Sequence, residues 1–159
     1  MNRRSKDKCP PYDDYVCPET NQALETSMRG EAAAIKFYAY LAEMAPDQDQ
    51  RETILKIRND EIRHLKNFQA AYCCRTGCTY HYPEPNVEPP RSYCDGLQQA
   101  FNDEQEAYEF YKINMFCNEG RVKKAYNDAL LDEAEHGRWF NNLLIRNGCM
   151  HKQHEPQPC

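Results

Sequence analysis

The two halves of this chain of 159 residues resemble each other, and this internal repeat limits the folds open to the sequence. Residues 31–38 read EAAAIKFY, and residues 104–111, 73 positions later, read EQEAYEFY. Residues 60–64 read DEIRH, and residues 132–136, 72 positions later, read DEAEH. Because the two offsets are nearly equal, each half repeats one helix–turn–helix length, and each is predicted to be an αα-hairpin.

Helical patterns occupy the middle of the chain, and prolines, glycines and cap residues mark their ends. Pro46 disfavours helix in the residue before it, Asp47 is a plausible N-cap, and Gly148 suits a C-terminal cap. The predicted helices run from Thr20 to about Ala45, from Asp47 to about Tyr72, from Ser92 or Asp95 to about Asn118, and from just after Glu119-Gly120 to about Asn147. The predicted domains are a tail at 1–19, a helical bundle at 20–148 and a tail at 149–159.

The connections between these helices favour an all-α, ferritin-like four-helix bundle made of two αα-hairpins. Two connections are short, and residues 73–92, which contain four prolines, form one long crossover. About 20 extended residues cover roughly 60 Å, whereas a helix of about 25 residues is roughly 37 Å long. The crossover can therefore travel the whole length of the bundle.

The repeat carries Glu and His residues at the spacing of a metal site. Glu61 and His64 are three residues apart, as are Glu133 and His136, so each pair lies on one helix face. A lone Glu precedes each pair on the other helix of its hairpin. One Glu from each of two helices and Glu-x-x-His from the other two is the ligand set of di-iron and di-manganese bundles. The predicted metal ligands are Glu31, Glu61, His64, Glu104, Glu133 and His136.

Every predicted ligand falls in the apolar stripe of its helix, where an unpaired charge is expensive. On the first helix, for example, the stripe holds Leu24, Met28 and Leu41. A single Glu-x-x-His motif would fit an ordinary salt-bridged helix face, and a repeat that lost its metal is the alternative for the pair. Two motifs in repeated contexts favour metal.

At these residues the sequence resembles the ferritin-like superfamily, and within it the rubrerythrin and bacterioferritin type of di-iron centre. The resemblance covers Thr20 to Asn147. It implies that Tyr38 and Tyr111, seven residues after Glu31 and Glu104, form hydrogen bonds near the metals; the alternative is an ordinary core tyrosine. It also implies two Fe ions as cofactor, with Mn as the alternative, and a homodimer as one expected assembly.

The chain departs from that family pattern in three places. It has no paired Cys-x-x-Cys motifs of a rubredoxin-like domain. Rubrerythrins use an extra Glu three residues after the ligand on the third helix, and here that position is Ala107. The tail after Gly148 is too short and proline-marked for the fifth helix of a storage cage, so iron storage in a shell is disfavoured.

Nine cysteines cannot all pair within one molecule, and we expect them mainly as free thiols or occasional disulfides. Cys117, at the end of the third helix, is expected to be simply packed. Two groups could instead bind a soft metal or clip the crossover, although neither has a recognised ligand spacing. They are Cys73, Cys74, Cys78, His81 and Cys94, and Cys149, His151, His154 and Cys159.

Charge and hydropathy exclude other classes of protein. A net charge of −5 and a pI near 5.6 argue against nucleic-acid binding. No apolar run approaches the roughly 18 residues that span a bilayer, so no membrane partner is expected. The basic N-terminus lacks the apolar stretch of a secretory signal, which predicts a cytoplasmic location. The resemblance to small ferritin-like proteins of spore-forming bacteria implies a spore-associated location as the alternative.

The predicted function is a di-iron oxidoreductase that oxidises Fe(II) with O₂ or hydrogen peroxide, in a ferroxidase or peroxide-scavenging role, with an unknown electron donor. One alternative keeps the site and loads manganese, giving catalase-like disproportionation of peroxide. The other is a structural protein whose metals only brace the bundle. Tyr38 and Tyr111 would assist the first two as residues beside the metals.

Overall fold

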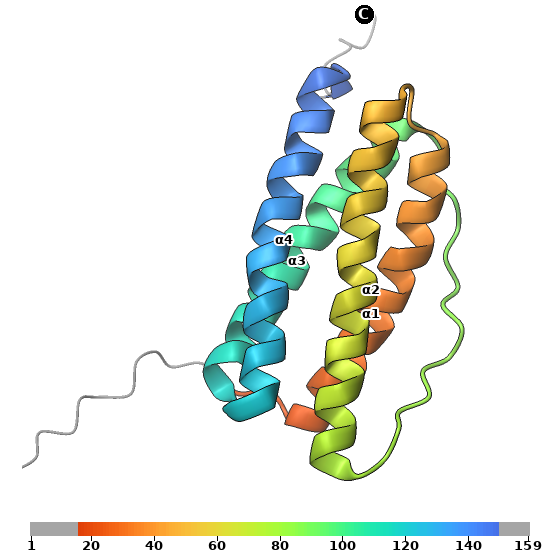
Figure 1. Cartoon of the computed structure of the whole chain (residues 1–159). Coiled ribbons are helices and arrows are strands. Elements are labelled where there is room, and N and C mark those ends of the chain that lie inside the picture. Colours follow the sequence, from red (N-terminus) through yellow and green to blue (C-terminus); the bar gives the residue numbers. More distant parts are fainter. Residues whose placement is uncertain (1–15, 150–159) are drawn as a thin grey trace, which may run out of the picture.

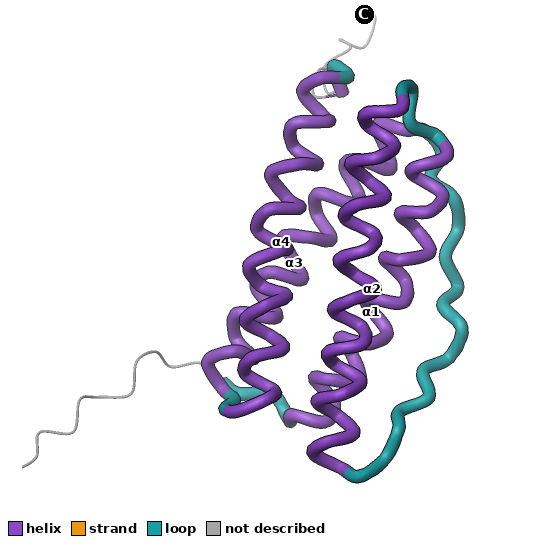
Figure 2. The backbone as a smooth tube through the Cα atoms, viewed as in Figure 1, coloured by secondary structure: helices purple, strands orange, loops and turns teal. Residues whose placement is uncertain are grey.

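The computed structural model describes residues 16–149, which form four α-helices and no strand (Figures 1 and 2). The helices are α1 (Thr20–Glu43), α2 (Gln48–Thr76), α3 (Tyr93–Cys117) and α4 (Gly120–Arg146). The all-α bundle predicted from the sequence is confirmed. Most of the predicted tails, 1–19 and 149–159, lies outside the described residues.

Side-chain caps set the helix starts that the sequence predicted. The Asp47 carboxylate accepts a hydrogen bond from the backbone N–H of Gln50, and the Ser92 hydroxyl accepts one from Asp95. The predicted end of α2 at Tyr72 is wrong by four residues. Cys73 to Thr76 contain no helix breaker, and α2 continues until Gly77, whose φ of 73° is the left-handed conformation that ends helices.

The four helices pair as two antiparallel hairpins, α1 with α2 and α3 with α4. The crossover between α2 and α3 runs along the outside of the bundle for its full length (Figure 1). It lies against α1, where Lys36 donates to the backbone carbonyl of Pro85 and Arg29 donates to the Tyr80 hydroxyl. Between the hairpins, α2 packs closely on α4, whereas α1 and α3 make the slighter contact.

A band of buried polar groups divides the apolar core into two layers. One layer is centred on Leu24, Phe68 and Tyr126, and the other is centred on Leu41 and Phe140; all five are fully buried. Burying each such side chain contributes about 1.5–3 kcal/mol, so the two layers hold the four helices in register. The polar band between them contains all six predicted metal ligands.

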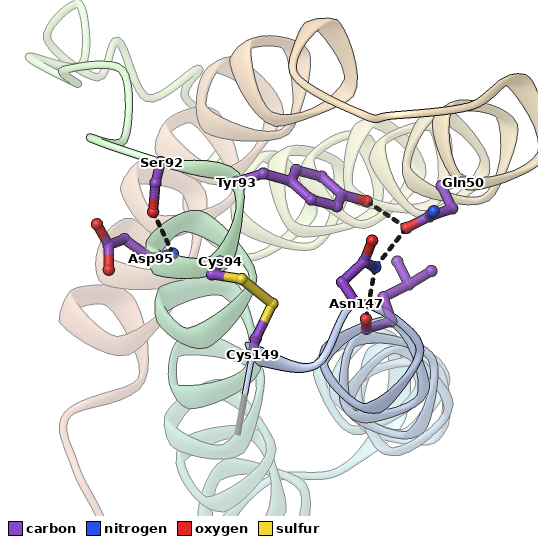
Figure 3. The surroundings of a disulfide bond; sticks show 8 residues. Gln50, Ser92, Tyr93, Cys94, Asp95, Asn147 and Cys149 are labelled. Atoms are coloured by element: carbon purple, nitrogen blue, oxygen red, sulfur yellow. Dashed lines mark hydrogen bonds between the residues drawn. A yellow bond between two sulfur atoms is a disulfide. The ribbon is translucent and has the colours of Figure 1, made fainter. Parts of the chain in front are cut away.

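Disulfides close both ends of the bundle, in line with the expectation of occasional disulfides, and they overturn the prediction for Cys117 and the crossover alternative for Cys94. Cys117 is not simply packed, because it is bonded to Cys17 at the start of the described chain. Cys94 does not clip the crossover; it is bonded to Cys149, and this links the start of α3 to the end of α4 (Figure 3). Tyr93 and Asn147 beside this disulfide both donate to the Gln50 side chain.

Candidate metal site

The bundle brings together the six residues predicted as metal ligands, at mid-length of the four helices. Their side chains form two overlapping groups, and within each group one ligand atom per residue lies within 4.8 Å of all the others. The members are Glu31, Glu61, His64 and Glu133 in one group and Glu61, Glu104, Glu133 and His136 in the other. All six are buried, with at most 3 % of each residue exposed.

Glu61 and Glu133 belong to both groups and face both imidazoles. His64 Nδ1 lies 2.9 Å from Glu61 and 3.2 Å from Glu133. His136 Nδ1 lies 3.1 Å from Glu61 and 3.2 Å from Glu133. Glu31 and Glu104 each approach one imidazole only, at 3.7 and 3.6 Å. The two central carboxylates could therefore bridge two ions. Each ion would also have one outer carboxylate and one imidazole of its own.

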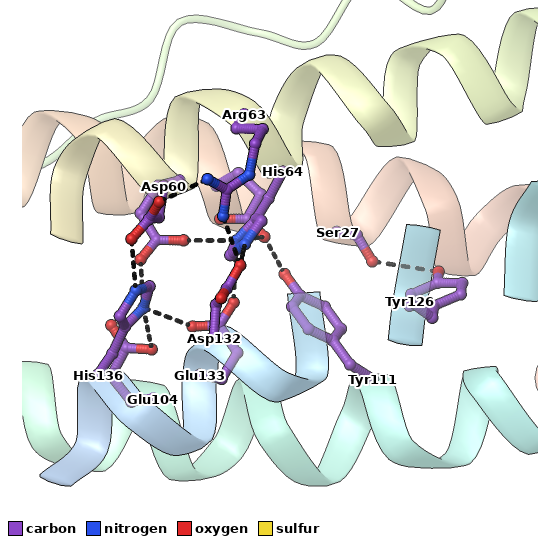
Figure 4. A network of polar contacts seen from close by, with 12 residues as sticks. Ser27, Asp60, Arg63, His64, Glu104, Tyr111, Tyr126, Asp132, Glu133 and His136 are labelled. Carbon is purple, nitrogen blue, oxygen red and sulfur yellow. Dashed lines mark hydrogen bonds and ion pairs between the residues drawn. The ribbon is translucent and has the colours of Figure 1, made fainter. Parts of the chain in front are cut away.

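Three residues without an assigned role in the sequence analysis fix the imidazoles from behind (Figure 4). His64 Nε2 lies 2.8 Å from Asp132, and His136 Nε2 lies 3.2 Å from Asp60, so each ring is held by the opposite half of the chain. Arg63 joins the two carboxylates, at 2.7 Å from Asp60 and 2.5 Å from Asp132. Such partners set the ring orientation and leave Nδ1 free to bind a metal.

Tyr38 and Tyr111 are both buried beside the cluster, and each contacts an outer carboxylate of the other half. Tyr111 donates a hydrogen bond of 2.5 Å to Glu31, and Tyr38 donates a short one to Glu104. Both rings are nearly fully buried. Burial, and then the nearest carboxylate, raise the pKa of each tyrosine well above its usual range, so both hydroxyls stay protonated donors.

The electrostatics of the cluster suit a bound cation. Burial, and then the neighbouring carboxylates, raise the pKa of Glu31 well above its usual range and that of Glu104 to about 8. Burial lowers the pKa of His64, but hydrogen bonds to Glu133 and Glu61 outweigh it and raise that pKa to about 11. In the metal-free protein, protons thus neutralise the site. One buried oxygen of Glu61 makes no regular hydrogen bond and faces His136 Nδ1 at 3.1 Å, so it can accept a metal ion.

A cavity of about 530 Å³ opens between α1 and α3 and reaches this cluster. Four of the six predicted ligands line its inner end: Glu31, Glu61, Glu104 and Glu133. A smaller cavity, of about 260 Å³, opens between α2 and α4 and touches His136 and Asp60. Small molecules and ions can therefore approach the buried carboxylates from the α1–α3 side.

Comparison with known proteins identifies the family. The sequence model of the rubrerythrin family matches residues 22–144, which is most of the chain. The chain belongs to the rubrerythrin family. It is also 37 % identical over 123 residues to the uncharacterized protein YhjR of Bacillus subtilis (strain 168), a match that covers 77 % of this chain and 84 % of that protein.

A solved structure shares the fold of this chain. A hypothetical protein from Pyrococcus furiosus superposes with a TM-score of 0.68, covering 82 % of this chain and 92 % of that one. The two sequences are 21 % identical, so this likeness concerns the fold alone. Together with the buried Glu and His cluster, membership of the rubrerythrin family points to a metal-binding bundle.

Relative to the rubrerythrin pattern, the chain lacks one carboxylate at the α1–α3 cavity. Ala107 stands where the family resemblance leads us to expect an extra Glu, and its side chain lines the cavity. On that side of the cluster, the cavity is open where a ligand would be expected. The site is left with the four carboxylates and two imidazoles described above.

The other cysteines and histidines form no comparable cluster within residues 16–149. Cys73, Cys74 and Cys78 are exposed free thiols, and His81 is exposed. Cys149 is bonded to Cys94, whereas His151, His154 and Cys159 lie outside the described residues, so the alternative of a soft-metal site there stays untested. None of the helices in the described part of the chain combines the length and apolar character needed to cross a membrane.

Proposed function

We propose that this protein is a di-iron oxidoreductase that oxidises Fe(II) with O₂ or hydrogen peroxide. The observation that carries the proposal is the pair of overlapping Glu and His groups, buried at the centre of the bundle. Carboxylate and imidazole donors suit iron, and a pair of ions suits six donors of which two face both groups. Membership of the rubrerythrin family supports the same assignment.

In this proposal the ligands are Glu31, Glu61, His64, Glu104, Glu133 and His136, with Glu61 and Glu133 in the bridging positions. Two bound ferrous ions would supply the two electrons that, with two protons, reduce one hydrogen peroxide to two waters. The protein provides the geometry and the buried surroundings. The electron donor that would return the ions to the ferrous state is unidentified.

The chain's own residues hold the site for this chemistry. Asp132 and Asp60 orient the two imidazoles, and Arg63 holds both carboxylates. Tyr38 and Tyr111 donate to the outer carboxylates, which fixes one oxygen of each and leaves the other for a metal. The α1–α3 cavity would admit the oxidant. On the opposite side, Asp60, Arg63 and Asp132 cover part of the cluster.

Anaerobic Fe(II) loading, followed by addition of O₂ or hydrogen peroxide, tests the proposal. We expect about two ions per chain and an absorbance change on oxidation. Glu61→Ala and His136→Ala should lower the metal content and abolish Fe(II) oxidation, because each removes a buried donor. Glu109→Ala, which changes an exposed residue on α3, is the control. Unchanged turnover in both site variants would defeat the assignment.

Manganese is the alternative cofactor, since the same donors accept either ion. In that case the protein would disproportionate peroxide without an external electron donor. Metal analysis of protein purified from its native host, with peroxide assays on the iron and manganese forms, separates the two. Activity confined to the manganese form would replace the iron proposal.

The cysteines favour a second candidate, a structural role in which metals only brace the bundle. Two disulfides are unusual for a chain in a reducing cytosol, and Cys73, Cys74 and Cys78 are exposed thiols able to bond to other chains. From the sequence we propose a cytoplasmic location. The disulfides count against it and favour the alternative, a spore-associated location. A structural role predicts intermolecular disulfides on non-reducing gels and metal-bound protein without redox turnover. A homodimer is likewise a proposal, tested by light scattering.

A further inference from the structure

The proposed ligands are buried, so a metal ion needs a route to them. Two cavities touch the cluster within the described residues, one between α1 and α3 and one between α2 and α4. Only the first reaches carboxylates from both proposed metal positions, Glu31 from one group and Glu104 from the other. The second reaches one imidazole, His136, from its far side, where Nε2 faces Asp60.

The α1–α3 cavity is lined by acidic side chains from its mouth to its floor. Asp103 and Glu106, both exposed on α3, line it in addition to the four buried carboxylates. No Lys, Arg or His lies among its described lining residues. A concave surface with charges of one sign raises the local concentration of the opposite ion and speeds its association. The exposed carboxylates therefore attract cations to the mouth of this cavity.

The α1 wall of the same cavity is formed by small residues. Gly30, Ala33 and Ala34 of α1 line it, and they are the repeat counterparts of Asp103, Glu106 and Ala107 on α3. A Cβ added at Gly30 would meet no heavy atom within 4 Å. The two halves thus share their ligands but differ here: one wall is small and neutral, and the other is acidic.

The smaller α2–α4 cavity is a poorer route. Its lining includes four acidic residues, whose charge Lys56 offsets in part: Asp49, Glu52, Asp60 and Glu135. An ion entering there would have to pass His136 and Asp60, which lie 3.2 Å from each other.

We propose that the α1–α3 cavity is the route by which divalent iron reaches the site, with Asp103 and Glu106 as its capture residues. The inference rests on the proposed function, because it supposes that the cluster binds metal. Asp103 and Glu106 act before binding and are no part of the ligand set. They set the rate at which ions arrive, and the six buried donors set how many ions stay.

Rapid mixing of the metal-free full chain with Co(II), used as a divalent probe, tests the route. The reaction is stopped with excess chelator at set times, and protein-bound cobalt is counted. Asp103→Asn/Glu106→Gln should slow association roughly 5- to 20-fold at low ionic strength and leave the final cobalt content unchanged. Salt should remove most of the difference, because it screens exposed charges. The matched control is Glu52→Gln/Glu135→Gln in the α2–α4 cavity, which should associate at the unmodified rate.

Charge reversal sharpens the test. Glu106→Lys should slow association at low salt further than Glu106→Gln, because a cation at the mouth repels the probe. Association of Asp103→Asn/Glu106→Gln at the unmodified rate in low salt would overturn the route, as would equal slowing by the Glu52→Gln/Glu135→Gln control. Failure of the unmodified chain to take up cobalt at all would instead overturn the metal site, so the two failures are distinguishable.

Discussion

Replacing Asp132 with Asn tests whether the residues behind the imidazoles matter to metal binding. One oxygen of Asp132 lies 2.8 Å from His64 Nε2 and 2.5 Å from the Arg63 guanidinium, so a single carboxylate orients the ring and holds the arginine. The amide keeps the size of the side chain and loses its charge. We expect Asp132→Asn to fold and to bind metal more weakly.

The size of the effect follows from the contact. Loss of a carboxylate partner of a metal-binding His typically costs 10- to 100-fold in metal affinity, which is about 1.4–2.8 kcal/mol. Asp132 makes the shorter of the two imidazole contacts, at 2.8 Å against 3.2 Å for Asp60 and His136. Asp132→Asn should therefore fall in the upper half of that range, and Asp60→Asn in the lower half.

Competition for Co(II) against a chelator of known affinity measures the change. Asp128→Asn is the matched control, because Asp128 lies one turn earlier on α4 and its partner Lys124, 2.6 Å away, is largely exposed. Exposed pairs contribute about 1 kcal/mol or less to stability, and this one touches no proposed ligand. If Asp132→Asn held cobalt as tightly as Asp128→Asn, the imidazoles would not depend on their carboxylate partners.

Three further predictions follow from the same structure. Cys94→Ser should lower the free energy of unfolding by about 4 kcal/mol, because the disulfide with Cys149 closes a loop of 55 residues. Chemical denaturation of the oxidised proteins measures the change, and an unchanged denaturation midpoint would contradict the disulfide. Metal loading at pH 7 should release at least about two protons per chain, because raised pKa values keep Glu104 and His64 protonated without metal. Metal affinity should therefore rise with pH. A pH indicator in weak buffer reports the proton release, and its absence would refute Glu104 and His64 as metal ligands. Tyr111→Phe should weaken metal binding several-fold, less than loss of a ligand, because Glu31 loses only its hydroxyl partner; the titration used for Asp132 checks this, and a loss as large as that of Glu61→Ala would make Tyr111 a ligand.

The sequence predicted the helices and the central cluster because both depend on local geometry. On any helix, Glu61 and His64 share a face, and a lone Glu in the same apolar stripe must face the same core. The short turns and the long crossover then leave few arrangements of four helices. The metal itself stays a proposal, although the six donors lie together as the pattern required.

The sequence pattern could not predict contacts between elements that are far apart in the chain. Pairing of His64 with Asp132 spans 68 residues and depends on how α2 is rotated against α4. The repeat did contain the signal, because an Asp precedes the Glu in both matching segments. Cys17 and Cys117 are 100 residues apart, and nothing in their spacing predicts that they meet. On α3, Tyr108 shares the helix face of Glu104 and Tyr111, yet it is only partly buried.

The repeat exchanges partners between its halves, and this explains why the site needs the whole bundle. Tyr111 of the second hairpin donates to Glu31 of the first, and Asp132 of the second holds His64 of the first. Each metal group likewise takes three residues from one hairpin and one from the other. An isolated hairpin would therefore offer three donors, without the carboxylate and hydroxyl that orient them. Because the donors meet only when the hairpins dock, any ion bound there stabilises the docked state over the separated one.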